Sequence, residues 1–136
     1  MGLVHAEITL KNAADEVRAR EGLINKEDIR QVTVDALADT GAYTLVINEA
    51  VRKELGLDLL GTAPGRLANG ISEKYNLAGP LEIRWKNRST NMDALVIPNA
   101  RDVLLGAIPL EAMDLIVNPL KEEVIGAHGD EILFLV

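Results

Sequence analysis

The chain has 136 residues, enough for one domain with a buried core, and we expect residues 1–136 to form a single domain. Apolar residues make up 48% of the chain but aromatic residues only 3%, so the core must be aliphatic. The net charge of −7, without a cluster of Lys and Arg among aromatic residues, argues against nucleic acid as a partner.

The chain has no cysteine, which excludes disulfides and thiolate metal sites. The N-terminus lacks a basic-then-apolar signal pattern, and no apolar run is long enough to span a bilayer. We therefore expect a soluble, cytoplasmic protein with no membrane partner.

Short stretches of alternating or apolar residues predict a chain made mostly of β-strands. The expected strands lie at residues 3–10, 32–38, 44–47, 66–68, 71–77, 81–85, 92–97, 103–107, 115–117 and 132–136. Many short strands with few helices predict a mainly β, barrel-like fold.

Two asparagines precede stretches that can form short helices. Asn48 can cap a helix that Gly56 ends, and Asn12 can cap another through about Arg20. The charged segment 11–30 also fits an elaborated hairpin loop, so this alternative stays open.

Glycines and prolines mark the connections. Residues 62–65 are predicted to be a loop, and Asn69-Gly70 favours a hairpin with a two-residue type I′ turn. Gly79-Pro80 predicts a break between strands. Pro109 suits the first turn of a short helix that extends to about Asp114. The segment between residues 117 and 132 is predicted to be a polar loop.

An Asp-Thr-Gly-Ala sequence follows the strand at residues 32–38. Thr40 can bond the local backbone and Gly41 permits a tight turn, a combination suited to holding the Asp39 carboxylate rigidly in a dry place. Asp-Thr-Gly is also a good turn at the end of any strand. Residues 36–42 and 103–107 are both apolar strands that end in Gly-Ala, as in a domain of two similar halves or by coincidence.

Several of these pieces occur in one order: Asp39-Thr40-Gly41-Ala42, Leu67-Ala68-Asn69-Gly70, Leu104-Leu105-Gly106 and the helix at 109–114. This ordered set resembles the retroviral-type aspartic proteases (retropepsins), and more closely their small bacterial single-domain relatives. The resemblance covers about residues 32–119. It implies a retropepsin-like closed β-barrel with one or two short helices and a flap hairpin.

The resemblance also implies the site residues. They are the catalytic Asp39; the active-site loop residues Thr40, Gly41 and Ala42; the substrate-binding flap residues Ala68, Asn69, Gly70 and Ile71; and the second apolar-Gly element Leu104, Leu105 and Gly106. The chain departs from the family pattern in its charged segment at 11–30, in its length beyond the second helix and in a flap tip without an aromatic residue.

By the same resemblance, the protein is an aspartic endopeptidase that acts on peptide or protein substrates. One Asp-Thr-Gly per chain implies a homodimer in which two Asp39 carboxyls share a proton and activate a water. Ala42 cannot donate a hydroxyl hydrogen bond to Asp39, which should leave the pair less acidic. The mechanism requires no cofactor and no metal.

Other interpretations remain. A retropepsin-like fold can act as a non-catalytic dimeric module that binds peptides, and a plain β-domain can contain Asp-Thr-Gly by chance. Asp35 lies four residues before Asp39 and is interpreted as an edge or structural acid. His5 and His128 lack a paired spacing, so a zinc site is not expected.

Overall fold

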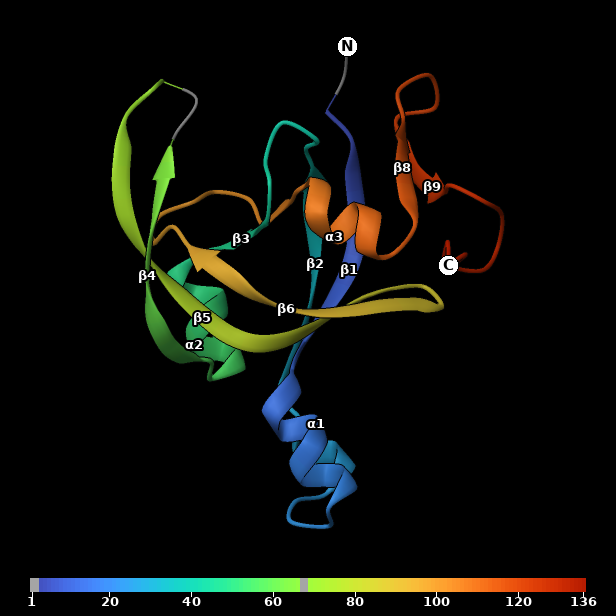
Figure 1. The fold of residues 1–136 in the computed structure, drawn as a ribbon. Coiled ribbons are helices and arrows are strands. Elements are labelled where there is room, and N and C mark those ends of the chain that lie inside the picture. The colour runs from blue at the N-terminus through green and yellow to red at the C-terminus, as the bar shows by residue number, and fades with distance from the viewer. Residues whose placement is uncertain (1–2, 67–68) are drawn as a thin grey trace.

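A computed structural model describes residues 3–66 and 69–136, and these form mainly strands with short helices (Figure 1). The strands are β1 (His5–Asn12), β2 (Gln31–Ala38), β3 (Leu45–Ile47), β4 (Asp58–Arg66), β5 (Ser72–Trp85), β6 (Arg88–Val96), β7 (Leu104–Leu105), β8 (Leu115–Asn118) and β9 (Glu123–Gly126). The helices are α1 (Ala13–Arg20), α2 (Glu49–Leu55), α3 (Ala107–Ala112) and a 3₁₀ turn, η1 (Lys26–Asp28). No helix in the described ranges has the length and apolar character needed to cross a membrane.

The main sheet contains seven strands in the order β1-β2-β7-β3-β6-β5-β4. Because β1 pairs antiparallel with β5 as well as with β2, hydrogen bonds close the run from β1 to β5 into a ring. This closure leaves β4 as the outer edge strand. β8 and β9 form a separate two-stranded sheet. The prediction of a mainly β fold is confirmed.

Alternate residues of the strands face an aliphatic core. On β1, Ala6, Ile8 and Leu10 are buried, on the face that the sequence pattern predicted. Leu81 and Ile83 of β5 are fully buried against the same cluster. A one-residue slip of either strand would expose these side chains, so their burial fixes the register of the β1–β5 pairing.

The two apolar strands that end in Gly-Ala lie side by side. β2 pairs in parallel with β7, matching Leu37 with Leu104 and Ala38 with Leu105. β3 pairs with the other edge of β7, and the Asn48-capped helix α2 follows β3 as predicted. The parallel pairing places the chain just after β2 next to the chain just after β7, which brings the Asp-Thr-Gly motif to the start of α3.

β4 and β5 form a long hairpin that extends away from the rest of the sheet (Figure 1). Residues 62–65 belong to β4, so the loop predicted there was wrong. Pro64 is tolerated because β4 is an edge strand. Proline has no backbone N–H to donate, and on the outer side of an edge strand no neighbouring strand needs that hydrogen bond. The predicted break at Gly79-Pro80 is instead a bulge within the continuous strand β5.

The tip of this hairpin differs from the expected two-residue turn. Arg66 pairs with Ser72, and Asn69, Gly70 and Ile71 are not part of a strand. The Asn69 side chain accepts a hydrogen bond of 3.0 Å from the Ile71 amide, and Gly70 has a positive φ of 85°. Ala68, predicted as a flap residue, lies outside the described residues.

The C-terminal segment was predicted wrongly in two places. The partner of β8 is β9, which had been assigned to a polar loop, while residues 132–136 form no strand. In this segment, side chains make hydrogen bonds to backbone carbonyls and amides that a neighbouring strand would otherwise make. The buried Arg88 guanidinium donates to the carbonyls of Asp114 and Gly129, and the Leu133 amide donates to the Asp114 carboxylate at 3.1 Å. Phe134 and the residues after it are exposed.

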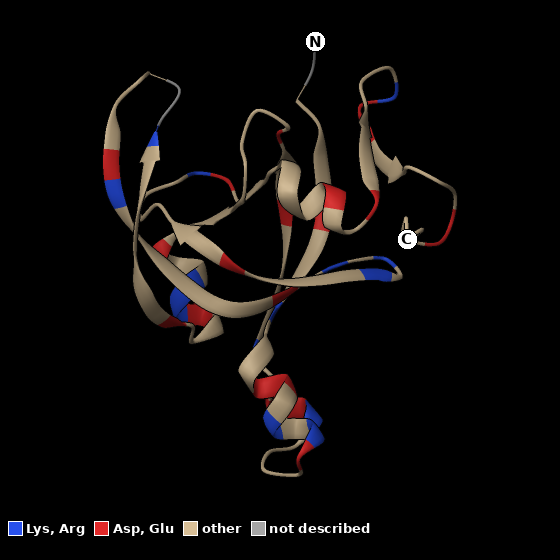
Figure 2. Ribbon diagram, in the orientation of Figure 1, with Lys and Arg blue, Asp and Glu red and all other residues tan. Residues whose placement is uncertain are grey.

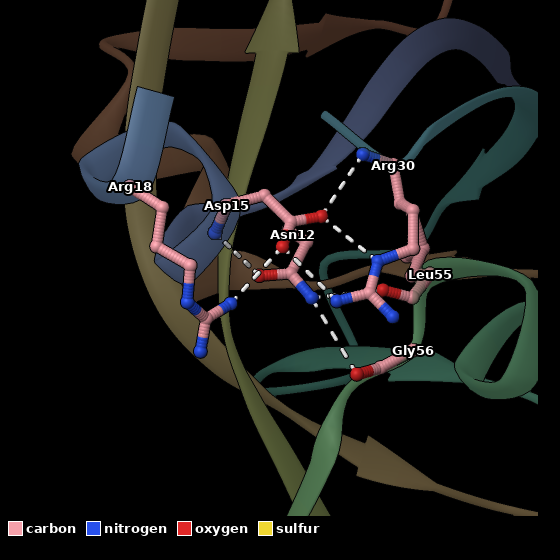
Figure 3. A network of polar contacts seen from close by, with 6 residues as sticks. All are labelled: Asn12, Asp15, Arg18, Arg30, Leu55 and Gly56. Carbon is pink, nitrogen blue, oxygen red and sulfur yellow. Dashed lines mark hydrogen bonds and ion pairs between the residues drawn. The ribbon is translucent and has the colours of Figure 1, made fainter. Parts of the chain in front are cut away.

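A buried aspartate attaches α1 to the domain (Figure 3). The Asn12 side chain accepts the Asp15 amide at 3.0 Å and donates to the Leu55 carbonyl at 2.9 Å. The Asp15 carboxylate accepts bonds from Arg30 Nε at 2.8 Å and from Arg18 Nη1 at 3.1 Å. The hydrogen bond from Arg30 is the main reason that the pKa of Asp15 is lowered to about 2. Segment 11–30 is therefore an elaborated connection of the antiparallel β1–β2 hairpin, and it contains the helix α1 with its own polar anchor.

Asp15→Asn is expected to lower the free energy of unfolding by about 2 kcal/mol at pH 7, the value of a pKa shift from 3.8 to about 2. Because the folded-state pKa is lowered, this stabilisation is present above about pH 4 and is lost as the pH falls toward 2. Urea unfolding at pH 7 and pH 3 measures it. Glu27→Gln, at an exposed position of η1, should change little. Equal effects of both substitutions would contradict the assigned role of Asp15.

Candidate active site

Asp39 stands where β2 leaves the sheet. Its amide donates to the Leu105 carbonyl of the neighbouring β7 at 3.0 Å, which fixes the backbone. The Gly41 amide donates to Asp39 Oδ1 at 2.9 Å, and the Ala42 amide donates to the Asp39 carbonyl at 3.1 Å. The turn at residues 39–42, called here the active-site loop, thus orients its own carboxylate.

The Asp39 side chain is exposed in the single chain, as are Thr40 and Gly41. The expected dry environment is therefore not met by one chain alone. The physical reason is that β2 is buried only up to Ala38, and the chain then reaches the surface. Exposure lets water solvate the carboxylate, which removes the cost of an unpaired buried charge.

The start of α3 is hydrogen-bonded to the residues that directly follow the active-site loop. The Gly106 amide donates to the Thr44 carbonyl at 3.1 Å, and the Ile108 amide donates to the Tyr43 carbonyl at 2.8 Å. A Cβ atom on Gly106 would lie 2.5 Å from the Thr44 carbonyl oxygen and 2.7 Å from the Ala42 carbonyl oxygen. Since both atoms belong to the backbone and cannot easily move, only glycine allows this approach.

A cavity of about 720 Å³, called here the Asp39 cavity, opens beside the active-site loop. Asp39, Gly41 and Ala42 form one side of it, and the β4–β5 hairpin forms another. Most of the remaining lining is aliphatic, from Val46, Leu77, Leu95, Ile97 and Leu104. An extended apolar cavity with a carboxylate at its edge suits a peptide segment with aliphatic side chains.

Two tyrosines in this cavity were missed by the sequence analysis. Tyr43 follows the active-site loop and is 81% exposed, whereas Tyr75 of β5 is 8% exposed. Tyr75 lies against Gly65, where a Cβ would come within 2.9 Å of its ring. Tyr75 and Leu77 are two residues apart on β5, so they point to the same face of the strand, and both line the cavity. This alternation was the sequence signal that could have identified Tyr75.

The other predicted site residues lie apart from one another. Leu104 lines the Asp39 cavity, whereas Thr40 lines a different hollow of about 560 Å³ with Leu110 and Ile116. Thr40 therefore lies on the side of the active-site loop that faces away from the cavity. Asn69, Gly70 and Ile71 are at the hairpin tip and do not line the cavity in this conformation.

The remaining acidic and histidine candidates lie elsewhere. Asp35 Oδ2 is 3.3 Å from His5 Nδ1 in an exposed pair on neighbouring strands. His128 Nδ1 is 2.8 Å from Asp114 Oδ1 near the C-terminal segment. Across residues 3–66 and 69–136, no three side chains of the metal-ligating types gather into a site.

The sequence matches one protein family. Residues 24–107 match the sequence profile of a family described as aspartyl protease. The matched range contains β2, the active-site loop, the β4–β5 hairpin and β7, and it ends at the first residue of α3. No curated protein sequence matches the chain.

The fold is similar to that of a solved structure. The crystal structure of the retroviral protease-like domain of Ddi1 from Leishmania major aligns with a TM-score of 0.60 at 14% sequence identity. The alignment covers 100% of this chain and 96% of that domain. The fold is therefore retropepsin-like, as the ordered motifs implied.

Proposed function

Since the chain belongs to the aspartyl protease family, we propose that it is an aspartic endopeptidase that works as a homodimer. In this proposal, the Asp39 side chains of two chains face each other across a two-fold axis and activate one water between them. The substrate is an extended segment of a peptide or protein that lies in the Asp39 cavity. No cofactor takes part.

The observation that carries this proposal is an exposed Asp39 at the edge of an apolar cavity. Each chain contains one Asp-Thr-Gly sequence, so a pair of such carboxylates needs two chains. Tyr43 and Ile108, which flank the active-site loop, are 81% and 51% exposed. Association through this face would bury both side chains and enclose Asp39, which supports a dimer formed around the two loops.

The chemistry follows from the closeness of two like charges. Two adjacent carboxyl groups cannot both ionise freely, so they share one proton, and their titration belongs to the pair. The ionised Asp39 accepts a proton from the water, while the protonated Asp39 of the other subunit polarises the scissile carbonyl. Water then attacks the carbonyl carbon, and the proton passes to the leaving nitrogen. Ala42 donates no hydroxyl bond that would favour the ionised form.

We expect the specific activity to fall on dilution, because only the dimer contains a complete site. Below the dissociation constant of the dimer, the rate should rise with about the square of the enzyme concentration. A quenched fluorescent peptide library assayed across a dilution series, with analytical ultracentrifugation of the same samples, measures both quantities. Statine-containing peptides should inhibit, because their hydroxyl resembles the tetrahedral species.

These measurements also distinguish the alternatives. A dimer that binds library peptides without cleaving them would establish the non-catalytic peptide-binding module instead. A monomer with full activity would contradict the shared-site mechanism.

A further inference from the structure

α1 carries a buried acidic contact that the proposed peptidase chemistry does not use. Where α1 packs on β5, Glu16 and Glu82 line the same hollow between the two elements. The Glu82 residue is only 7% exposed. Glu16 Oε1 is buried and has no hydrogen-bond partner among the described residues. Two acidic side chains therefore lie together where α1 packs on β5.

Arg84 is the cationic partner of Glu82. Arg84 Nε and Nη2 lie 3.0 Å and 2.9 Å from Glu82 Oε1, so two charge-assisted hydrogen bonds join the two side chains. A second negative charge on Glu16 would be repelled by Glu82. A proton on Glu16 removes this repulsion and supplies a donor for a bond between the two carboxyl groups.

The other charges near Glu16 act in the opposite direction but are weaker. Lys11 of β1 and Arg20 of α1 both favour the ionised form of Glu16. Burial, followed by the hydrogen bond and charge of Glu82, outweighs them and raises the pKa of Glu16 to about 7. Acidic and basic residues are mixed over the rest of this helical arm (Figure 2), so no single sign dominates its surface.

We propose that Glu16 and Glu82 share one proton that holds α1 against β5, and that this contact is a pH-sensitive latch. With the proton present, the latch is closed. Without it, two carboxylates face each other and α1 separates from β5 at this end. A hollow of about 460 Å³ lies beside the pair, lined also by Arg20 and Asn91, and gives water a route to exchange the proton.

The latch weakens as the pH rises. Glu16 has its usual pKa of 4.5 when α1 is detached and a pKa of about 7 when α1 is attached. The proton-linked stabilisation is therefore full below pH 4.5, is lost between pH 4.5 and about 7, and stays constant above that. Asp15, whose pKa is lowered to about 2, remains ionised and paired with Arg30 and Arg18 throughout this range.

Hydrogen exchange of the amides of residues 13–20 in the full-length chain, corrected for intrinsic exchange rates, tests the latch between pH 4 and 9. The opening constant should rise by up to about tenfold per pH unit between pH 4.5 and 7 and then level off. Glu16→Gln keeps a donor and carries no charge, so its opening constant should be independent of pH. No substrate is needed, so the result does not depend on the proposed peptidase activity.

Glu21→Gln, at the exposed C-terminal end of α1, is the matched control and should keep the wild-type profile. A wild-type opening constant that is flat across this range overturns the latch, and so does a slope that persists in Glu16→Gln. If Glu16→Gln does not fold, a ¹³C titration of the carboxyl groups in the unmodified chain decides the matter. An inflection of Glu16 near pH 7 supports the latch, and one near pH 4.5 overturns it.

Discussion

Asp39→Asn is expected to lower peptide cleavage by at least about 10³-fold while leaving the fold and the dimer nearly intact. The amide keeps the shape of the carboxylate, and its oxygen can still accept the Gly41 amide bond of 2.9 Å. It cannot share a proton with its partner or accept one from water. Steady-state cleavage of a fluorogenic peptide measures the loss, and circular dichroism with ultracentrifugation measures fold and assembly.

Asp35→Asn provides the control for this experiment. Asp35 lies on the same strand as Asp39 but pairs with His5 at the surface and does not line the Asp39 cavity. The Asp35→Asn variant should therefore cleave the peptide at close to the wild-type rate. Substantial cleavage by Asp39→Asn, with contaminating protease excluded, would refute Asp39 as the catalytic residue.

Gly106→Ala is expected to destabilise the domain by about 3 kcal/mol and to abolish cleavage in the molecules that remain folded. The added Cβ would lie 2.5 Å from the Thr44 carbonyl oxygen, so the active-site loop and the start of α3 must move apart. Overpacking costs about 1–3 kcal/mol, and each weakened backbone hydrogen bond adds about 1 kcal/mol. Urea unfolding gives the free energy, and active-site titration gives activity per folded molecule.

Gly22→Ala separates this packing effect from a backbone effect. Gly22 follows α1 at a φ of 76°, with no atom within 4 Å of the position of a Cβ. Its substitution should cost about 1 kcal/mol through the unfavourable φ alone and leave cleavage unchanged. If Gly106→Ala costs no more than Gly22→Ala and retains activity, the close approach at Gly106 does not position the active-site loop.

Features with a local physical cause could be predicted from the sequence. The Asn48 side chain caps α2 because it accepts the Val51 amide at 2.9 Å, and Gly56 ends the helix in the left-handed conformation. The apolar run before Asp39 forms β2, and the Asp-Thr-Gly turn follows where the pattern indicated. Each depends on residues a few positions apart, which a sequence pattern records directly.

Features that depend on distant residues could not be predicted. Residues 132–136 have a strong strand composition, but the Leu133 amide donates to the Asp114 carboxylate and not to a neighbouring strand. Pro64 suggested a loop because nothing local shows that β4 is an outer strand. No sequence pattern indicated the contact of Glu16, which is one of several charged residues on α1. Its partner Glu82 is on β5, and only the folded chain brings the two together.

The pairing of β2 with β7 has a consequence for the order in which the protein folds. Leu37 and Leu104 are neighbours in the sheet but far apart along the chain, and Asp39 is held by the carbonyl of Leu105. Bringing these two residues together closes a long loop, which has a large entropic cost. Contacts between residues so far apart in sequence therefore form slowly. We therefore expect the active-site loop to become ordered late in folding. A nascent chain that has not yet reached residue 105 carries the Asp-Thr-Gly motif without its geometry.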